Sequence, residues 1–292
     1  MANLRADRLF RGDLVAVTDV RCRGAGMVCG TEEQAGTHQV VFTRSGLFVK
    51  HTGRRQIVGQ PNQAIFFNRD ECYRVSHPAA IGDDCTVFVF ATEIIVQVLQ
   101  ISGRPPPTRS EAPFEVPQVR VDPKVLWRFQ NLRRTLRAGR ATALEVEENA
   151  LEILASLLRA AGPATAMGGH GPARVIVQRR RELAEAVQVA LAARPGAAHS
   201  LAALAHSVDC SPFHLARVFR EEVGLPVHRY LVRLRLALAL ERLMDGEPNL
   251  SALACDLGFT SHSHLTSLFR RTFATTPSRF RGNDLSEGRP PP

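Results

Sequence analysis

The sequence predicts an α+β protein of two domains, a β-rich amino-terminal domain and an all-α carboxyl-terminal domain. Short apolar runs separated by turn residues fill residues 13–91, which is typical of a small barrel or sandwich. Within residues 200–281 the apolar spacing is helical, and one pattern of residues appears there twice. A chain of 292 residues, 45% of them hydrophobic, can form two such cores.

Six short strands are expected in the amino-terminal domain, which we assign to residues 1–117. Turn residues such as Ser45, Gly46 and Gly82 separate them. The expected strands are 14–17, 38–42, 47–51, 64–68, 73–75 and 85–90. Helical spacing begins at 92–102, and a proline-rich irregular stretch, 104–117, then ends the domain.

A pair of helices is expected next, within residues 118–161. Residues 123–138 and 142–161 each carry one apolar stripe at helical spacing. Residues 162–173 contain a glycine-rich run that predicts a flexible linker. The last residues, 284–292, are rich in proline and polar side chains, and we expect a disordered tail.

The repeated pattern lies in residues 174–283, the predicted carboxyl-terminal domain. Each copy has a short apolar helix, a tight turn and a second helix, which is the helix-turn-helix arrangement. Ser211 is a good N-cap for the second helix, and Pro212 suits a first helical position because its missing N–H costs nothing there. The copies lie 49 residues apart over the first helix and 50 over the second, so the second turn carries one extra residue.

The second helix of each copy has one apolar stripe and one polar face. Leu215 and Phe219 lie four residues apart, as do Leu265 and Phe269, so these side chains are expected to be buried. The opposite faces are free for a partner. They carry Phe213, Ala216, Arg217 and Arg220 in the first copy, and His262, Ser263, Thr266, Ser267, Arg270 and Arg271 in the second.

A continuous helix is expected to join the two copies over residues 227–244. At 1.5 Å per residue it is about 27 Å long, and successive major grooves on one face of DNA lie about 34 Å apart. Such a rod would hold the two outward faces near the spacing of one DNA turn. The plainer alternative is two ordinary helical hairpins, and the duplication at fixed spacing with Arg, His and Ser outward argues against it.

Residues 200–281 resemble the DNA-binding domain of the AraC/XylS family of bacterial transcription regulators. The matching motifs are the runs at 211–220, 233–237 and 257–270, with Thr276, Pro277 and Ser278 behind; about 110 of the 292 residues, from Arg174 on, match closely. The resemblance implies that each second helix enters the major groove of double-stranded promoter DNA. It implies base-reading roles for Phe213, Ala216, Arg217, His262, Ser263 and Ser267, and we expect Arg220, Arg270 and Arg271 to hold phosphates.

The match departs from the family pattern at three positions. Asp209 replaces a turn glycine in the first copy, and Ala274 replaces a glycine after the second reading helix. Ser267 occupies a position where a longer base-reading side chain is frequent. The second copy is therefore expected to contribute more to phosphate contact than to sequence choice. The three consecutive arginines at 179–181 fit a solvated face as well as a phosphate clamp.

The order of the amino-terminal strands is similar to the cupin-like sensor domain that many members of this family place first. This resemblance implies a β-barrel, a small-molecule effector of unknown identity, and activation more than repression, with RNA polymerase as a partner. It also implies a homodimer through the helical pair at 118–161. The alternative for that pair is that both apolar stripes cover the barrel.

The polar residues of this domain leave two sensor chemistries to weigh. Metal-binding cupins need His and carboxylate ligands converging at about 2.0 to 2.2 Å from the ion. His38 stands near one ligand position, but Tyr73 replaces a later His, and His51 and His77 are not at ligand spacing. We therefore expect no metal and no cofactor. The remaining option is a thiol sensor formed by Cys72 and Cys85, although cysteines of this kind are usually buried and inert.

Charge and composition agree with a DNA-binding protein of the cytoplasm. The net charge is +9, and residues 174–283 carry 15 basic and nine acidic groups, as phosphate neutralisation requires. No run of 18 apolar residues predicts a membrane span, and the charged amino end does not suit a signal peptide. Six cysteines without a CxxC pair indicate reduced thiols.

The sequence thus predicts a sequence-specific DNA-binding transcription regulator rather than an enzyme. No Ser/His/Asp set, phosphate loop or carboxylate pair lies at mechanistic spacing. The alternatives are a metal- or thiol-dependent sensor regulator, a cupin-type metal enzyme, and an architectural DNA protein without sequence preference. The last of these would bind any duplex equally.

Overall fold

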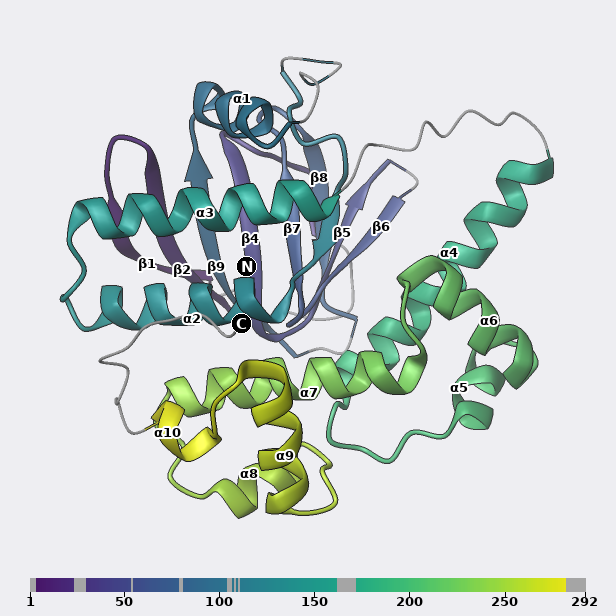
Figure 1. Cartoon of the computed structure of the whole chain (residues 1–292). Coiled ribbons are helices and arrows are strands. Elements are labelled where there is room, and N and C mark those ends of the chain that lie inside the picture. Colours follow the sequence, from purple (N-terminus) through teal and green to yellow (C-terminus); the bar gives the residue numbers. More distant parts are fainter. Residues whose placement is uncertain are drawn as a thin grey trace.

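The computed structural model describes residues 4–23, 30–53, 55–78, 81–103, 107, 109, 111–161 and 172–281. A β domain covered by helices lies against an all-α domain, so the predicted α+β architecture of two domains is confirmed (Figure 1). The predicted glycine-rich linker at 162–171 and the predicted tail at 284–292 lie outside the described residues.

The described strands form two open sheets, so a closed barrel is wrong. A six-stranded sheet has the order β1-β2-β9-β4-β7-β10 and a four-stranded sheet the order β3-β8-β5-β6, with antiparallel pairing. The strands are β1 (Leu4–Arg11), β2 (Val15–Cys22), β3 (Glu33–Gln34), β4 (His38–Gly46), β5 (Phe48–Thr52), β6 (Arg55–Gly59), β7 (Gln63–Phe67), β8 (Cys72–Ser76), β9 (Asp83–Phe90) and β10 (Gln118–Arg120).

The chain changes sheets at Gly46, between β4 and β5. Gly46 has a φ of +73°, and a Cβ there would lie 2.0 Å from the carbonyl oxygen of Gly82. Only glycine fits this close approach in the left-handed region. The sharp turn sends β5 into the second sheet, and none of the pairings among the described strands joins the sheet edges to close a barrel.

Both faces of the six-stranded sheet are covered. Val40 and Phe42 point toward α1 (Thr92–Ile101), α2 (Pro123–Arg137) and α3 (Ala143–Ala161), and the Phe42 ring stacks on Phe129 of α2 at 4.4 Å. On the other face, Val41 and Phe67 pack with Phe48 of the second sheet. The helical pair α2–α3 therefore covers the sheet, which is one of the two alternatives that the sequence left open for this pair.

The carboxyl-terminal domain contains the two predicted helix-turn-helix units. Its helices are α4 (Pro172–Ala193), α5 (Leu201–Ser207), α6 (Pro212–Val223), α7 (Val227–Met244), α8 (Leu250–Asp256), α9 (His262–Phe273) and α10 (Pro277–Arg281). The connecting helix α7 has the predicted bounds, and the turn between α8 and α9 is one residue longer than that between α5 and α6. No helix in the described part of the chain has the length and apolar character to cross a bilayer.

Candidate nucleic-acid interface

The second helix of each unit, α6 or α9, is named its reading helix after its predicted role. In the first unit, α6 is fixed by its cap and its buried stripe. Ser211 Oγ accepts a hydrogen bond from the backbone N–H of His214 at 3.2 Å, which confirms the predicted N-cap. Leu215 and Phe219 are fully buried, and the Phe219 ring meets Tyr230 of α7 edge-on at 5.4 Å. The buried stripe holds α6 against the connecting helix, so its other face is directed outward.

The second unit repeats this construction with α9. Ser261 Oγ accepts from the backbone N–H of His264 at 3.1 Å, and Leu265 and Phe269 are fully buried. Each of residues 211–220 has the same exposure class as its counterpart in 261–270. The two reading helices are therefore equivalent in how they are seated.

Every residue that the sequence assigned to DNA lies on the outward faces. Phe213 is 79% exposed, an unusual state for so large an apolar ring. Ala216 is half-buried, as is its counterpart Thr266. The others are exposed: Arg217 and Arg220 on α6, and His262, Ser263, Ser267, Arg270 and Arg271 on α9. Their contacts with bases or phosphates stay predictions.

Each reading helix borders a surface hollow. The hollow on α9 is lined by His262, Ser263, Thr266, Ser267, Arg270, Arg271 and Thr276. The hollow on α6 also includes α4, so that Arg179 lies beside Arg217. Arg180 also lines this hollow, but it pairs with Glu222 of α6 at 3.0 Å, and Arg181 lies 3.9 Å from the same carboxylate. The three consecutive arginines thus divide, one toward the outward surface and two toward ion pairs between helices.

Two of the departures from the family pattern fall where the backbone is left-handed. In the turn between the helices, Asp209 has a φ of +50° and its counterpart Gly258 a φ of +72°. At the end of the reading helix, Gly224 has a φ of +75° and its counterpart Ala274 a φ of +56°. Each unit therefore has glycine at one of its two left-handed positions and another residue at the other. Glycine suits both positions because it has no Cβ that would oppose a positive φ.

Arg235 of α7 joins the two units, a role that sequence reasoning did not assign. Its Nε and Nη2 donate to the carbonyl oxygens of Pro195 and Ala197, ahead of α5, at 2.7 and 3.0 Å. Its Nη1 donates to the carbonyl oxygen of Gly258, in the second turn, at 2.7 Å. One guanidinium therefore binds three backbone acceptors from both units, which fixes their relative position on α7.

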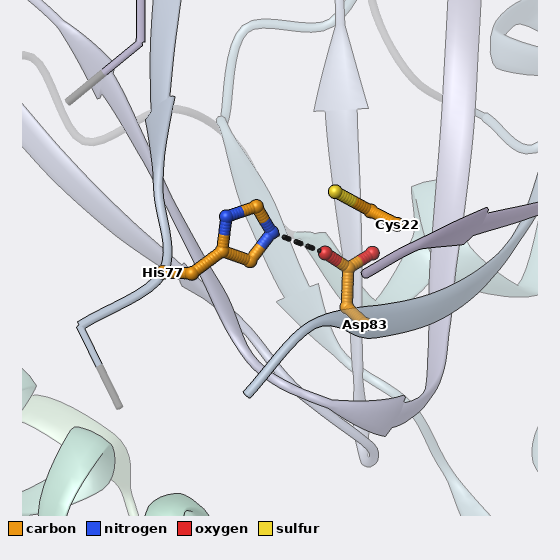
Figure 2. Close-up of side chains that lie close together, drawn as sticks. All are labelled: Cys22, His77 and Asp83. Atoms are coloured by element: carbon orange, nitrogen blue, oxygen red, sulfur yellow. Dashed lines mark hydrogen bonds and ion pairs between the residues drawn. The ribbon is translucent and has the colours of Figure 1, made fainter. Parts of the chain in front are cut away.

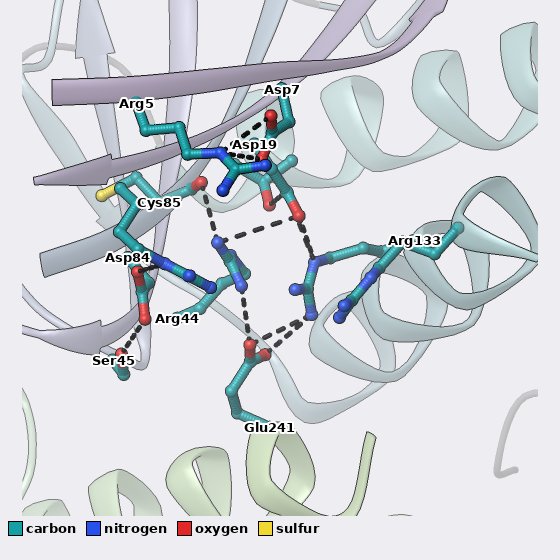
Figure 3. Close-up of polar contacts among 12 residues, drawn as sticks. Arg5, Asp7, Asp19, Arg44, Ser45, Asp84, Cys85, Arg133 and Glu241 are labelled. Atoms are coloured by element: carbon teal, nitrogen blue, oxygen red, sulfur yellow. Dashed lines mark hydrogen bonds and ion pairs between the residues drawn. The ribbon is translucent and has the colours of Figure 1, made fainter. Parts of the chain in front are cut away.

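A buried charge network ties the carboxyl-terminal end of α7 to the amino-terminal domain (Figure 3). Glu241 of α7 accepts from Arg44 of β4 at 2.8 Å and from Arg133 of α2 at 3.0 Å. Asp19 of β2 lies 3.1 Å from Arg133 and 3.8 Å from Arg44. The four formal charges balance, which offsets the cost of burying them.

Each helix-turn-helix unit has its own contact with the amino-terminal domain. Gln188 Oε1 of α4, in the first unit's contact, accepts from Gln60 at 3.2 Å, Gln63 at 3.1 Å and the Tyr230 hydroxyl at 3.2 Å. In the second unit's contact, Trp127 of α2 packs on Phe280 at 4.8 Å and on Phe273 at 6.1 Å.

The residues weighed as sensor groups occupy different surroundings. His38 is buried, its Nδ1 accepts from the backbone N–H of Arg69 at 3.0 Å, and burial lowers its pKa. Cys72 is exposed on β8, whereas Cys85 is buried and its Sγ donates to Asp83 at 3.0 Å. Cys72 and Cys85 therefore differ in exposure, which argues against the thiol sensor that the sequence left as an option.

Comparison with known proteins finds relatives of the carboxyl-terminal domain. A helix-turn-helix domain family model matches residues 204–283. The probable transcription factor PqrA of Proteus vulgaris is 31% identical over 80 residues, which are 27% of this chain and 66% of that protein. The transcriptional activator RhaS of Escherichia fergusonii is 37% identical over 73 residues, which are 25% of this chain and 26% of that protein. The chain thus matches less than two thirds of the length of either relative.

A crystal structure of apo ToxT from Vibrio cholerae aligns over 93% of this chain and 98% of that chain, with 9% identity and a TM-score of 0.37. The cupin-like resemblance of the amino-terminal domain stays a prediction. For the carboxyl-terminal domain, the predicted resemblance is confirmed by the family match and the two regulators. The carboxyl-terminal domain is therefore a helix-turn-helix domain of the AraC/XylS type.

Proposed function

We propose that the whole chain is a sequence-specific transcription regulator that binds promoter DNA with both helix-turn-helix units. The observation that carries this proposal is the position-by-position repeat of exposure in residues 211–220 and 261–270. Two equivalent outward faces on one connecting helix fit two successive major-groove segments of double-stranded DNA. A single exposed helix would not need the repeat.

The outward side chains divide into base-reading and phosphate-binding groups. Arg217 offers two parallel donors that match guanine O6 and N7, and Phe213 offers an apolar surface for a thymine methyl group. Arg220, Arg270 and Arg271 neutralise phosphates and set the register without choosing sequence. On α9, Ser263 and Ser267 are short, so the second unit depends more on the phosphate contacts of Arg270 and Arg271.

The experiment compares Arg217→Ala with Arg270→Ala on the DNA selected by the wild-type chain and on random DNA. Arg217→Ala should weaken binding to the selected site by about 1–3 kcal/mol and leave random DNA nearly unchanged. Arg270→Ala should weaken both and lower the salt slope by about 1. Equal losses on both DNAs for both variants would favour an architectural protein without sequence preference.

For the amino-terminal domain we propose a cupin-like sensor of a small-molecule effector, although its sheets do not close. The hollow between the two sheets supports this role, because Phe48, Phe67, Val41 and Val75 give it an apolar lining next to polar groups. Activation through RNA polymerase in the cytoplasm, and a homodimer, complete the proposal. The similarity of the carboxyl-terminal domain to the transcriptional activator RhaS supports the first of these.

An enzymatic role is not favoured, because the relatives of the matched domain are named as transcription regulators. The metal-dependent sensor is different. A specific group of side chains in the amino-terminal domain favours it as a form of the proposed regulator.

A further inference from the structure

Three buried side chains meet at one end of the hollow between the sheets (Figure 2). Cys22 ends β2, His77 directly follows β8, and Asp83 begins β9. Cys22 and Asp83 face one another in the β2–β9 register. One ligand atom from each of the three lies within 4.8 Å of the other two, and each residue is no more than 8% exposed.

The donor set and its spacing suit a tetrahedral cation site. Zn²⁺ binds thiolate at about 2.3 Å and imidazole or carboxylate at about 2.0 to 2.2 Å, so neighbouring ligand atoms lie about 3.3 to 3.8 Å apart. Side-chain shifts of roughly 1 Å would bring the present arrangement to those distances. His77 Nε2 now lies 2.7 Å from Asp83 Oδ1, and a cation between them would replace the shared proton.

Charge balance favours a divalent cation over a ligand that carries a single charge. Cys22 as a thiolate and Asp83 as a carboxylate supply two negative charges, and a neutral His77 supplies none. One divalent ion therefore leaves the buried site without net charge. A thiolate, an imidazole and a carboxylate together select a borderline or soft ion, and not Mg²⁺ or Ca²⁺, which prefer oxygen ligands.

Cys85 orients the carboxylate. Its Sγ donates to Asp83 Oδ2 at 3.0 Å, which leaves Oδ1 directed at His77. Outer groups of this kind fix the position of a ligand and tune its affinity. Cys85 is thus a positioning residue, and the hollow beside the cluster leaves room for a fourth ligand.

We propose that Cys22, His77 and Asp83 bind a thiophilic divalent cation of the Zn²⁺ class. The same strands carry the charge network to α7, since Arg44 Nη2 donates to the Cys85 carbonyl oxygen at 3.4 Å and Arg44 Nη1 reaches Glu241. Cation binding at the ends of β2 and β9 therefore acts on the contact that seats the connecting helix. This regulatory consequence rests on the proposed function, whereas the cation site itself does not.

The test is a titration of the purified full chain, freed of metal under reducing conditions, with Co²⁺ and then Zn²⁺. The expected result is one Co²⁺ per chain, with a near-ultraviolet thiolate-to-cobalt absorption that Zn²⁺ abolishes by displacement. Cys22→Ser should remove that absorption, and Asp83→Asn should weaken binding at least about 100-fold. Cys85→Ser should weaken it by about 10- to 100-fold and keep the absorption.

Cys72→Ser, which removes an exposed thiol, is the matched control and should titrate like the wild type. Thermal unfolding of each metal-free variant verifies that it is folded, and His77→Gln provides a second ligand variant if Asp83→Asn is not. Unchanged Co²⁺ absorption in Cys22→Ser, or no binding by the wild type, would overturn the site.

The regulatory consequence is measured separately, as the affinity of the full chain for its selected DNA with and without Zn²⁺. Zn²⁺ should change the DNA affinity of the wild type at least several-fold. It should leave the DNA affinity of Cys22→Ser unchanged. If the chain binds metal but its DNA affinity does not change, the cation is not the effector, although the cation site itself stands. Metal binding by a chain that shows no DNA binding at all would overturn the proposed function and not the cation site.

Discussion

The first helix-turn-helix unit contacts the amino-terminal domain through apolar packing of Val49 and Val58 against α4 and a group of amide and hydroxyl groups, whereas the contact of the second unit contains packed aromatic rings. Gln188 collects three donors at the first contact, whereas Trp127 packs on Phe273 and Phe280 at the second. A single hydrogen bond contributes about 0.5–1.5 kcal/mol net, and burial of a large aromatic side chain contributes more. The units match on the outward side and differ in the kinds of side chain that hold them inside.

This difference teaches that the repeat and the docking are separate features of the chain. The repeat sets the caps, the buried stripes and the outward faces of both units. The docking depends on single residues such as Trp127 and Gln188, which have no counterparts in the repeat. We therefore expect the loss of one aromatic side chain at the second contact to cost more than the loss of Gln188 at the first.

The largest effect should come from truncating the aromatic contact. Trp127 is 4% exposed, so Trp127→Ala should lower the free energy of unfolding by about 3–5 kcal/mol. Gln188→Ala should lower it by about 1–3 kcal/mol, because it leaves buried donors unpaired. Denaturant unfolding measures both, with exposed Phe213→Ala as the control. Equal losses for Trp127→Ala and Gln188→Ala would remove the proposed difference in docking.

The next effect concerns the second turn, where Gly258 is both left-handed and tightly packed. An added Cβ would lie 2.5 Å from the carbonyl oxygen of Gly196 and 2.6 Å from Arg235. Gly258→Ala should cost about 2 kcal/mol or more through strain and displacement of Arg235. Gly246→Ala is the matched control. Gly246 has a φ of +88° and open space around it, so this substitution adds backbone strain without a steric clash. Equal unfolding free energies for the two variants would show that Arg235 is not fixed there.

A smaller effect of opposite sign is expected at the end of α9. Ala274 has a φ of +56°, which costs a residue with a Cβ about 1–2 kcal/mol. Ala274→Gly should therefore stabilise the chain by up to about 1 kcal/mol, after the larger chain entropy of glycine in the unfolded state is subtracted. Asp209→Gly should gain less, because aspartate tolerates this region. A loss of stability in Ala274→Gly would contradict the assigned strain.

The smallest effect should be a pH dependence confined to the first unit. Burial, with the nearby charge of Glu182, raises the pKa of Glu185 on α4 to about 7. A carboxyl with a raised folded-state pKa contributes most below its unfolded pKa, and this contribution is lost as the pH rises through 7. The melting temperature should therefore fall between pH 5 and 8, and fall less in Glu185→Gln. Exposed Glu148→Gln should keep the wild-type slope.

The repeated domain could be predicted from sequence because its signals are local. The caps Ser211 and Ser261 lie a few residues from the groups they bind, and the stripes repeat within one helix. The strands β1 and β6 were missed because their sequences, LRADRLFR and RQIVG, carry charged or polar side chains and little apolar alternation. The closed barrel was wrong because strand patterns do not reveal whether sheet edges meet.

The contacts between domains could not be predicted, because they join residues far apart in the chain. Arg44 and Glu241 are separated by 197 positions. His77 was compared with the other histidines, whereas its partners are Cys22 and Asp83, which only the β2–β9 register brings together. Arg235 lies in a recognised motif, but its three acceptors are backbone carbonyls, for which sequence carries no signal.

The central claim is that two equivalent reading helices on α7 occupy successive major grooves. Chemical footprinting of the full chain on its selected DNA, combined with guanine-methylation interference, tests this most directly. We expect two protected major-groove segments on one face of the duplex, centred about 10 base pairs apart, with interference in the first segment lost in Arg217→Ala. A single protected segment, or two on opposite faces, would contradict the account.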